Sequence, residues 1–463
     1  MTTNQIQSLS SPEIVERYLS FFRTRGHVEL PGSPLAVPGN TTSFIIAGMQ
    51  PLLPYLRGQL TPPSARLTSL QRCLRTYDAD AVGTNCKNNT SFHMLGNWSI
   101  GDYGKREAIE MALDLLLNGF KLDQSRLWVT VFAGDAELGI PLDEVAIQEW
   151  QRVGMPRERI VPLGSEDNLW TMGGPGPCGP CSEIFVDRGE NASCTAPVCQ
   201  PGCACERFLE IWNLVFMEYE RLSQGPLVPL PWRNVDTGMA LERMAAVLQG
   251  AESVFSVDMF QPALARLAEI ESCGQSNERA REIRARRMIV DHTRAVLLAG
   301  VAGVLPGRDG RGSVVRRLIR RAARQGRVLG IARPFLSELL LPLVQGHGSL
   351  LTQDEQVQVP SLMQVLMGEE KLFERVLTTG LRELAHLKPG SEGVVPGREL
   401  FRLQAEKGFP ADLAGEILAE RDVRVDWSDY ERAVEEHQRV SRVSAEKHFR
   451  GSDGPKEVSL PLD

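Results

Sequence analysis

Two opposite charges separated by a short run of small and apolar residues are the side chains of this sequence best suited to chemistry. Asp236 and Arg243 flank residues whose pattern predicts a strand leading into a buried helix. A buried arginine is costly unless it meets an anion, and a polyphosphate is a natural partner for a guanidinium group. Asp236 is suited to receive an ammonium group. One element would then hold a nucleoside triphosphate and an amino acid, although an internal salt bridge between the two residues is an equally simple interpretation.

Two further motif regions favour the ligand-binding interpretation over the internal salt bridge. The first comprises residues 69–75 and 90–103, and the second comprises residues 176–184 and 207–217. Together with residues 235–243, they resemble the catalytic region of the alanyl-tRNA synthetases, a family of class II aminoacyl-tRNA synthetases. The motifs occur in the family's order and spacing. The resemblance extends from about residue 12 to about residue 447, which is nearly the whole chain.

The resemblance implies a nucleotide site in which ATP lies bent over an antiparallel sheet. Arg75 matches the arginine that grips the α-phosphate and the amino acid carboxylate, where charge builds during in-line attack. Phe92 matches the ring on which adenine stacks, and Arg243 matches the arginine that covers the other side and reaches the γ-phosphate. Glu210 is a candidate Mg²⁺ ligand, because a hard cation prefers carboxylate oxygens. Plain core packing is the alternative for Phe92. The expected catalytic residues are Arg75, Asp236 and Arg243.

An amino acid pocket follows from the same match. Asp236 would pair with the substrate ammonium, Trp170 would wall the pocket, and Asn213 would hydrogen-bond the substrate. A bulky wall excludes side chains larger than alanine but rejects glycine and serine only weakly. Met94 would help to close this pocket, although a methionine beside an aromatic ring is more often simple filler.

Four clustered cysteines indicate a structural metal site. Cys194, Cys199, Cys203 and Cys205 lie in a Pro- and Gly-rich segment near residues 190–206, where we expect no helix or strand. In a cytosolic protein such spacing favours a Zn²⁺ site over two disulfides. The gap between the last two cysteines is tighter than usual, so one ligand could come from elsewhere in the chain.

An arginine-rich helix is the candidate RNA contact. Its arginines recur along one side of the predicted helix, and the apolar residues between them face inward. A solvated helix face is the usual explanation of a charge run, but arginine of a single sign also suits phosphate contacts. The resemblance adds acceptor-stem recognition by Asp412 and by position 308. The expected RNA-binding residues are Arg308, Arg316, Arg317, Arg320, Arg321, Arg324 and Asp412.

Several positions depart from the family pattern. Lys87, Asn88 and Asn89 replace an Arg-His-His, and His93 replaces a glutamate. Arg308 stands where an asparagine helps to read the acceptor-stem wobble pair, so we expect weaker discrimination of that pair. The chain also stops where the editing and oligomerising domains of the family would begin, and its seven histidines contain no editing-domain zinc motif. We therefore expect a monomer that does not proofread in cis.

The sequence predicts an α+β protein with two folded regions. Residues 1–250 should form the class II domain, an antiparallel sheet flanked by helices, with one helix over residues 12–26 and a strand over residues 127–132. Residues 251–450 should form a mostly helical domain that recognises the acceptor stem. Its expected helices span residues 258–271, 280–299, 312–325 and 353–387, and shorter elements follow over residues 393–448. Strand signals end at about residue 256, and residues 451–463 should form a polar tail.

Composition limits the class of protein. The 463 residues carry a net charge of −7, and 42% are hydrophobic, as in ordinary soluble enzymes. No apolar run is long enough for a membrane span, and the polar N-terminus lacks the features of a signal peptide. We therefore expect a cytoplasmic protein with no membrane partner.

Two enzymatic functions remain open, and both use ATP and Mg²⁺. The favoured one activates alanine, or a similarly small amino acid, and transfers it to the 3′ end of tRNA, with the alanine tRNA acceptor stem as partner. The alternative is a paralogue that activates a small amino acid for a biosynthetic or other non-translational acceptor. A regulatory RNA-binding protein with a decayed active site is a third possibility. The presence of the nucleotide and amino acid residues argues against it.

Overall fold

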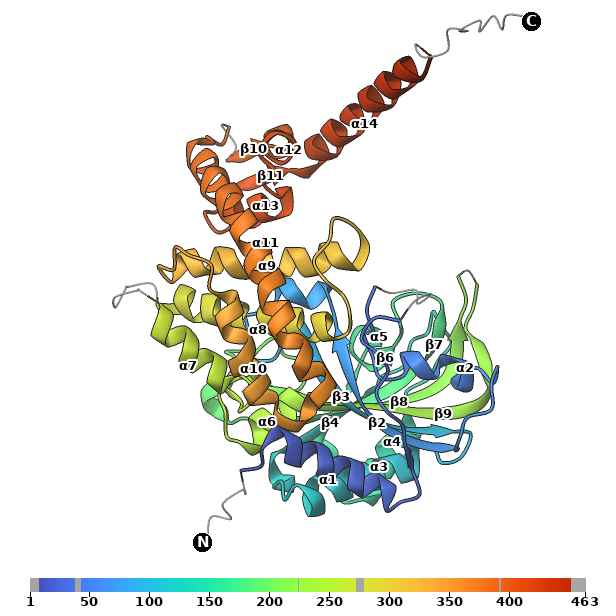
Figure 1. Cartoon of the computed structure of the whole chain (residues 1–463). Helices are drawn as coiled ribbons and strands as arrows, with labels where there is room; N and C mark the ends of the chain where they lie inside the picture. The colour runs from blue at the N-terminus through green and yellow to red at the C-terminus, as the bar shows by residue number, and fades with distance from the viewer. Residues whose placement is uncertain (1–7, 38–42, 224, 272–278, 391–392, 451–463) are drawn as a thin grey trace, which may run out of the picture. The chain divides into compact units, whose positions relative to one another are not determined.

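A computed structural model describes residues 8–37, 43–223, 225–271, 279–390 and 393–450 (Figure 1). In this part of the chain nine strands form one sheet, in the order β1-β2-β3-β9-β8-β7-β4-β5, with β6 paired to β7. Neighbouring strands are mostly antiparallel, whereas β1–β2 and β4–β5 are parallel. The strands are β1 (Val28–Glu29), β2 (Arg66–Leu74), β3 (Ser91–Ile100), β4 (Leu127–Phe132), β5 (Ile160–Leu163), β6 (Leu169–Trp170), β7 (Gly176–Asp187), β8 (Phe208–Arg221) and β9 (Val228–Ala240).

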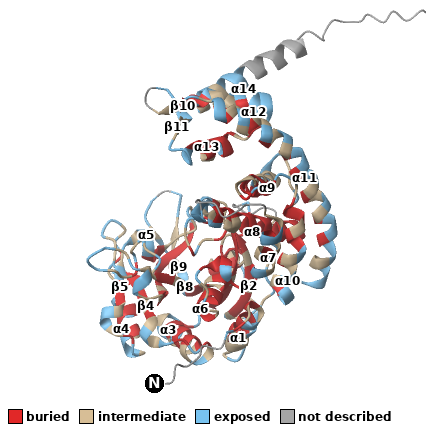
Figure 2. Cartoon of the chain, turned by 90° about the vertical axis from the view of Figure 1, so that its left-hand side faces the viewer, coloured by how far each residue is buried: buried red, intermediate tan, exposed pale blue. Residues whose placement is uncertain are grey.

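Strand β3 is buried on both faces along nearly its whole length, and so are the parts of β8 and β9 in the centre of the sheet, much of which is red in Figure 2. Successive side chains point to opposite faces of a strand, so each strand serves two environments. On one face, Tyr18 of α1 (Ser11–Arg23) donates a hydrogen bond of 2.9 Å to Asn97. On the other face, Trp98 packs into an apolar cluster with Met94. The sheet therefore has a face covered by α1 and a second face that is free to carry a pocket.

Short helices complete the part of the fold built on this sheet. The helix expected over residues 12–26 is α1, and its first turn is stabilised by the Ser10 N–H, which donates to the Glu13 carboxylate at 2.8 Å. The strand expected over residues 127–132 is β4, so this prediction is confirmed. The remaining helices of this part are α2 (Leu53–Leu56), α3 (Lys105–Asp114), α4 (Glu144–Arg152), α5 (Ser165–Asn168) and α6 (Leu241–Leu248).

Helices dominate after residue 256, as expected. Each of the four helices predicted between residues 258 and 387 is present, with bounds shifted by a few residues. Nearly every residue of α8 from Met288 onward is buried, which explains why its sequence shows little amphipathic contrast. These helices are α7 (Gln261–Ile270), α8 (Arg279–Val301), α9 (Gly310–Val328), α10 (Leu340–His347) and α11 (Gln353–His386).

The expectation that strands end near residue 256 is wrong. Two three-residue strands, β10 (Val394–Pro396) and β11 (Arg424–Asp426), pair in parallel. They are too short to show the alternation by which a strand is recognised in sequence. Three helices accompany them: α12 (Gly397–Lys407), α13 (Ala411–Ala419) and α14 (Trp427–Arg450). The predicted polar tail at residues 451–463 lies outside the described residues.

The chain divides into two compact units, residues 1–367 and residues 368–463. Residues 251–367 thus pack with the sheet, although their helical composition differs from that of the first 250 residues. The division expected at residue 250, between a class II domain and a domain that recognises the acceptor stem, stays a prediction.

Candidate functional site

A cavity of about 240 Å³ opens on the face of the sheet away from α1. It lies over the central strands and beside the start of α6, where residues from distant segments meet. All of the residues predicted to hold a nucleotide or an amino acid line it. They are Arg75, Phe92, Met94, Trp170, Glu210, Asn213, Asp236 and Arg243.

One end of the cavity pairs an arginine with an aromatic ring. Arg75 follows β2, and its guanidinium carbon lies 4.8 Å from the centroid of the Phe92 ring. The Arg75 Nε donates to the Ile46 carbonyl at 2.9 Å, which fixes the side chain. Phe92 also packs with Ile45 and Cys73 in a small apolar cluster. The ring is therefore part of the core and at the same time part of the cavity wall.

Arg243 is held at the first turn of α6. Its Nη1 donates to a Glu210 carboxylate oxygen at 2.6 Å, and its Nε donates to the Lys87 carbonyl at 3.2 Å. Burial raises the pKa of Glu210, but the charge and hydrogen bond of Arg243, together with the charges of Lys87 and Arg75, outweigh burial, and the net pKa is lowered. Glu210 is therefore an ionised carboxylate that already has one cationic partner.

Asp236 is a nearly buried carboxylate, 6% exposed, on the cavity floor. The Trp98 Nε1 donates to it at 2.6 Å. Burial raises the pKa of Asp236 to about 7, against the opposing effect of the Trp98 hydrogen bond. Since Arg243 pairs with Glu210, the internal Asp236–Arg243 salt bridge considered from the sequence is not formed. Asp236 therefore has no cationic partner of its own in the described structure.

Small and apolar groups surround this carboxylate. Trp170 and Met94 pack against the apolar cluster below the cavity, and the Met94 sulfur accepts the Gly48 N–H at 3.1 Å. A Cβ atom at Gly238 would lie 2.9 Å from that sulfur, so the strand approaches Met94 as closely as a glycine allows. The Asn213 Nδ2 donates to Glu183 at 3.2 Å, while the Asn213 Oδ1 is buried without a partner in the described residues. A polar atom of this kind can be satisfied by a ligand.

Sequence reasoning missed Glu183, which also lines the cavity. Burial and the neighbouring charge of Glu210 raise the pKa of Glu183. The sequence clue to Glu183 was its position in the second motif region, residues 176–184. In the structure Glu183 pairs with Asn213 in the β7–β8 register. The other polar lining residues that were not assigned are Asp78, Lys87, Asn88, Asn89 and Glu242.

A register shift brings Glu210 to the cavity. Ile184 pairs with Trp212 and Phe185 pairs with Glu210, so Ile211 is an extra residue in β8. Strict alternation would have pointed Glu210 and Asn213 to opposite faces of the sheet. The extra residue restores Glu210 to the face of Asn213, as a β-bulge does.

Three of the four clustered cysteines form a candidate metal site. The sulfur atoms of Cys194, Cys199 and Cys203 lie within 4.8 Å of one another, and the Cys205 sulfur lies 3.6 Å from that of Cys199. Thiolates of a tetrahedral Zn²⁺ site, with Zn–S bonds of about 2.3 Å, are about 3.8 Å apart. A disulfide would need a sulfur–sulfur distance of about 2 Å. All four are free thiols of intermediate burial, and the set therefore fits a metal better than two disulfides.

The arginine helix α9 differs in part from the expected solvated face. Arg317 is exposed, and Arg316 and Arg320 are partly exposed. Arg321 and Arg324 are each only 5% exposed, because they lie on the side of α9 that packs into the fold. Arg321 pairs with Asp80 at 2.8 Å. The spacing was compatible with one arginine face, but packing divides the arginines between surface and interior.

The two predicted acceptor-reading residues are both exposed. Arg308 lies in the turn before α9, and Asp412 lies in the first turn of α13. Arg308 belongs to the first compact unit and Asp412 to the second. In the part of the chain that the structure describes, no helix combines the length and apolar composition that a bilayer span needs.

The chain matches the family model described as tRNA synthetases class II (A) over residues 13–456, and it belongs to that family. The curated proteins to which it is similar include several named alanine–tRNA ligase. The one from Thermoanaerobacter sp. (strain X514) is 40% identical over 454 residues, which cover 96% of this chain and 50% of that protein. The one from Caldicellulosiruptor saccharolyticus is 38% identical over 466 residues, covering 98% and 51%. The chain thus spans about half the length of these relatives.

Proposed function

We propose that this chain forms an aminoacyl-adenylate from ATP and alanine and transfers the alanyl group to the 3′ end of a tRNA. The observation that carries this proposal is that one cavity is lined by all the residues expected to hold the nucleotide and the amino acid. The names of the similar proteins support alanine as the amino acid. Membership of the class II family supports ATP and Mg²⁺ as the other requirements.

The nucleotide would lie between Phe92 and Arg243. Adenine would stack on the ring, and the guanidinium would cover its other side and reach the γ-phosphate. A carboxylate oxygen of alanine would attack the α-phosphorus, and the bond to the leaving pyrophosphate would break in line. Arg75 would neutralise the charge that develops on the α-phosphate. Glu210 would bind Mg²⁺ at the pyrophosphate, with Glu183 as a second carboxylate nearby.

The amino acid would be bound by its ammonium group and selected by size. Asp236 would gain the cationic partner that it lacks, and the Asn213 Oδ1 would accept a hydrogen bond from the substrate. Trp170 and Met94 would leave room for a methyl side chain and exclude larger ones. Discrimination against glycine and serine by such a pocket is weak.

The test of this function is a pair of measurements on the purified chain. Alanine should stimulate ATP–pyrophosphate exchange more than any larger amino acid, and the chain should then charge alanine tRNA. Absence of exchange with all small amino acids would contradict the proposal. Vigorous exchange without charging would favour the non-translational paralogue, an outcome that Arg308 at the acceptor-reading turn makes worth testing.

We also propose that the cysteines at positions 194, 199, 203 and 205 bind one structural Zn²⁺ ion. The supporting observation is the spacing of their sulfur atoms. Replacing Cys199 by serine should lower the zinc content from about one ion per chain to near zero, because three thiolates hold zinc far less well than four. Elemental analysis measures this, with Cys178→Ser, whose thiol is buried in β7, as the control. A zinc-free wild-type protein that is folded and active would contradict the site.

The exposed arginines of α9, together with Arg308, would contact RNA phosphates, while Asp412 would help to read the acceptor stem. Arg317→Gln should weaken binding of tRNA about equally for all sequences and reduce its salt dependence by about one phosphate contact. Arg324 was also expected to contact RNA, but it is buried, so Arg324→Gln should lower the melting temperature more than Arg317→Gln does. Binding titrations over a range of salt concentrations measure the first effect. An unchanged salt slope in Arg317→Gln would contradict a phosphate contact at that residue.

A further inference from the structure

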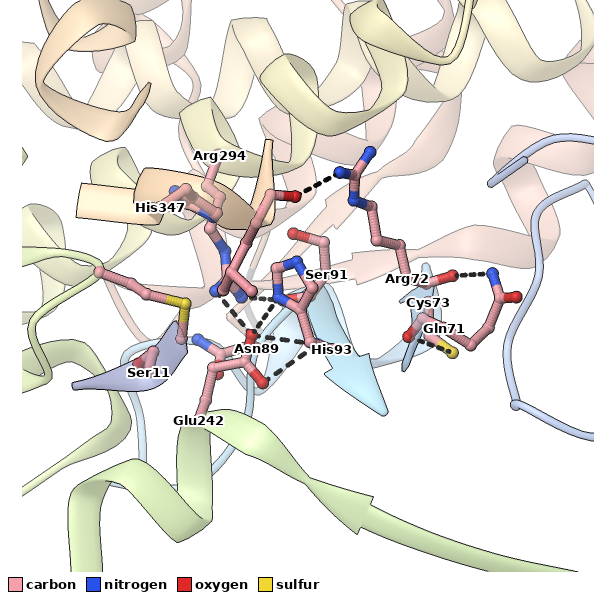
Figure 3. Close-up of polar contacts among 12 residues, drawn as sticks. Ser11, Gln71, Arg72, Cys73, Asn89, Ser91, His93, Glu242, Arg294 and His347 are labelled. Carbon is pink, nitrogen blue, oxygen red and sulfur yellow. Dashed lines mark hydrogen bonds and ion pairs between the residues drawn. The ribbon is translucent and has the colours of Figure 1, made fainter. Parts of the chain in front are cut away.

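A buried ion pair between Arg294 and Glu242 lies next to the cavity, which Glu242 also lines (Figure 3). Arg294 of α8 is 0% exposed, and its Nη1 donates to the Glu242 carboxylate at 2.8 Å. Its Nη2 donates to the Ser91 carbonyl, and its guanidinium carbon lies 4.4 Å from the centroid of the Phe260 ring. Charges so far from water are costly to bury, and they persist only where several partners hold them.

Both partners of Arg294 are direct neighbours of residues expected to clamp the adenine. Ser91 precedes Phe92 in β3, and Glu242 precedes Arg243 in α6. Glu242 also accepts the backbone N–H of His93 at 3.0 Å, so it ties α6 to β3. Ser91 and Phe92 are successive residues of β3, so their side chains point to opposite faces of the sheet. The contacts of Arg294 with Ser91 and Glu242 therefore fix the backbone that carries Phe92 and Arg243.

A second charged residue of α8 holds the segment just before β3. Asp291 is fully buried, and it accepts the backbone N–H of Thr90 at 3.0 Å and the Nδ2 of Asn89 at 3.1 Å. Asn89 itself lines the cavity. Asp291 lies one helical turn before Arg294, so one face of α8 holds residues 89–91 and Glu242. None of the residues that the sequence assigned to ATP lies on this helix.

We propose that Asp291 and Arg294 are positioning residues for the nucleotide: by fixing residues 89–92 and the start of α6, they set the distance between the Phe92 ring and the Arg243 guanidinium. This inference rests on the proposed adenylation function. At the amino acid end of the cavity, Trp98 holds Asp236, and neither of these two residues hydrogen-bonds to Asp291, Arg294 or Glu242 in the described structure. Loss of either residue should therefore weaken ATP binding and leave alanine binding largely unchanged.

The test measures ATP and alanine separately in the full chain. Asp291→Asn keeps the shape of the side chain but removes its charge, and we expect the Kd for ATP, measured by calorimetry without amino acid, to rise about tenfold. The KM for ATP in pyrophosphate exchange should rise in parallel, whereas the KM for alanine should change less than about twofold. Arg294→Lys, which keeps the charge but loses the two-pronged contact, should show the same split. Arg286→Gln is the matched control, because Arg286 lies on the same helix as Asp291 and Arg294 but pairs with Glu271 at the end of α7, away from the cavity.

Each outcome bears on a different claim. A wild-type chain that binds no ATP would overturn the proposed function and this inference with it. Normal ATP binding by the wild type, with Asp291→Asn and Arg294→Lys indistinguishable from Arg286→Gln, would overturn the positioning role alone. A lowered melting temperature with equal losses for ATP and alanine in both variants would show a general structural role, and it would also overturn the inference.

Discussion

Replacing Asp236 by alanine should abolish alanine-dependent ATP–pyrophosphate exchange. The carboxylate is buried, and among the described residues it accepts a hydrogen bond from the Trp98 Nε1–H but has no cationic partner, so a substrate ammonium would complete a charge pair in a site shielded from water. Loss of one member of a buried charge pair costs about 3 kcal/mol or more, which corresponds to a loss of at least roughly 100-fold in kcat/KM. Asp258→Ala, outside the cavity, is the control. Exchange within about threefold of the wild type would contradict the ammonium-binding role.

The same carboxylate predicts how alanine affinity depends on pH. Because burial raises the pKa of Asp236 to about 7, the free protein is largely protonated there below neutral pH. The ammonium group needs the ionised form, so the KM for alanine should fall as the pH rises from 6 to 8 and then level off. Initial-rate measurements over this range check the prediction. A KM for alanine that does not change between pH 6 and pH 8 would contradict it.

The stability of the free protein should fall as the pH rises, whereas its affinity for alanine should increase. The folded protein retains a proton on Asp236 that the unfolded chain releases near pH 3.8, so the free energy of unfolding should decrease as the pH rises from about 4 to about 7. Asp236→Asn keeps an acceptor for Trp98 but cannot ionise. It should therefore melt at a higher temperature than the wild type at pH 8, and the difference should shrink at pH 5.

Much of the site could be predicted because its residues lie in local motifs with a strong chemical signature. Arg75, Phe92, Asp236 and Arg243 occur in runs where a charge or a ring interrupts an otherwise buried strand or helix. The resemblance to the family then predicted that these residues lie together in one site. Helices α9 and α11 could be predicted from their periodicity, since both keep an amphipathic pattern. The 24-residue helix α14 was not predicted, because only shorter elements were expected over residues 393–448.

The features that were missed depend on tertiary contacts. The local sequence does not predict the extra residue at Ile211 that turns Glu210 toward the cavity. A bulge is defined by the pairing with the neighbouring strand, which the sequence of β8 does not show. The ion pair of Arg321 with Asp80 likewise joins residues far apart in sequence. Arg294 and Asp291 were invisible as functional residues for a related reason. Their partners belong to α6 and to β3 with the residues just before it, and only folding brings α8 next to these segments.

Replacing Arg75 by glutamine should reduce the rate of adenylate formation far more than the affinity for ATP. The negative charge on the α-phosphate grows in the transition state, and a preorganised guanidinium group acts most strongly at that point. Loss of such a donor typically lowers kcat by about 10²- to 10³-fold. The cation–π contact with Phe92 contributes less, about 1 kcal/mol, so the KM for ATP should rise only a few-fold.

Arg66→Gln is the matched control for Arg75→Gln. Arg66 begins β2, the strand that Arg75 follows, and it pairs with Asp102 and lies over the Tyr103 ring outside the cavity. Both substitutions remove one guanidinium group from the same part of the sheet, so a shared loss of folding would appear in both melting curves. Single-turnover measurement of adenylate formation separates the chemical step from binding. If Arg75→Gln raised the KM for ATP strongly at an unchanged rate constant, Arg75 would serve ground-state binding. The charge that develops at the α-phosphate would then have to be neutralised by another cationic group that lines the cavity, either Lys87 or Arg243.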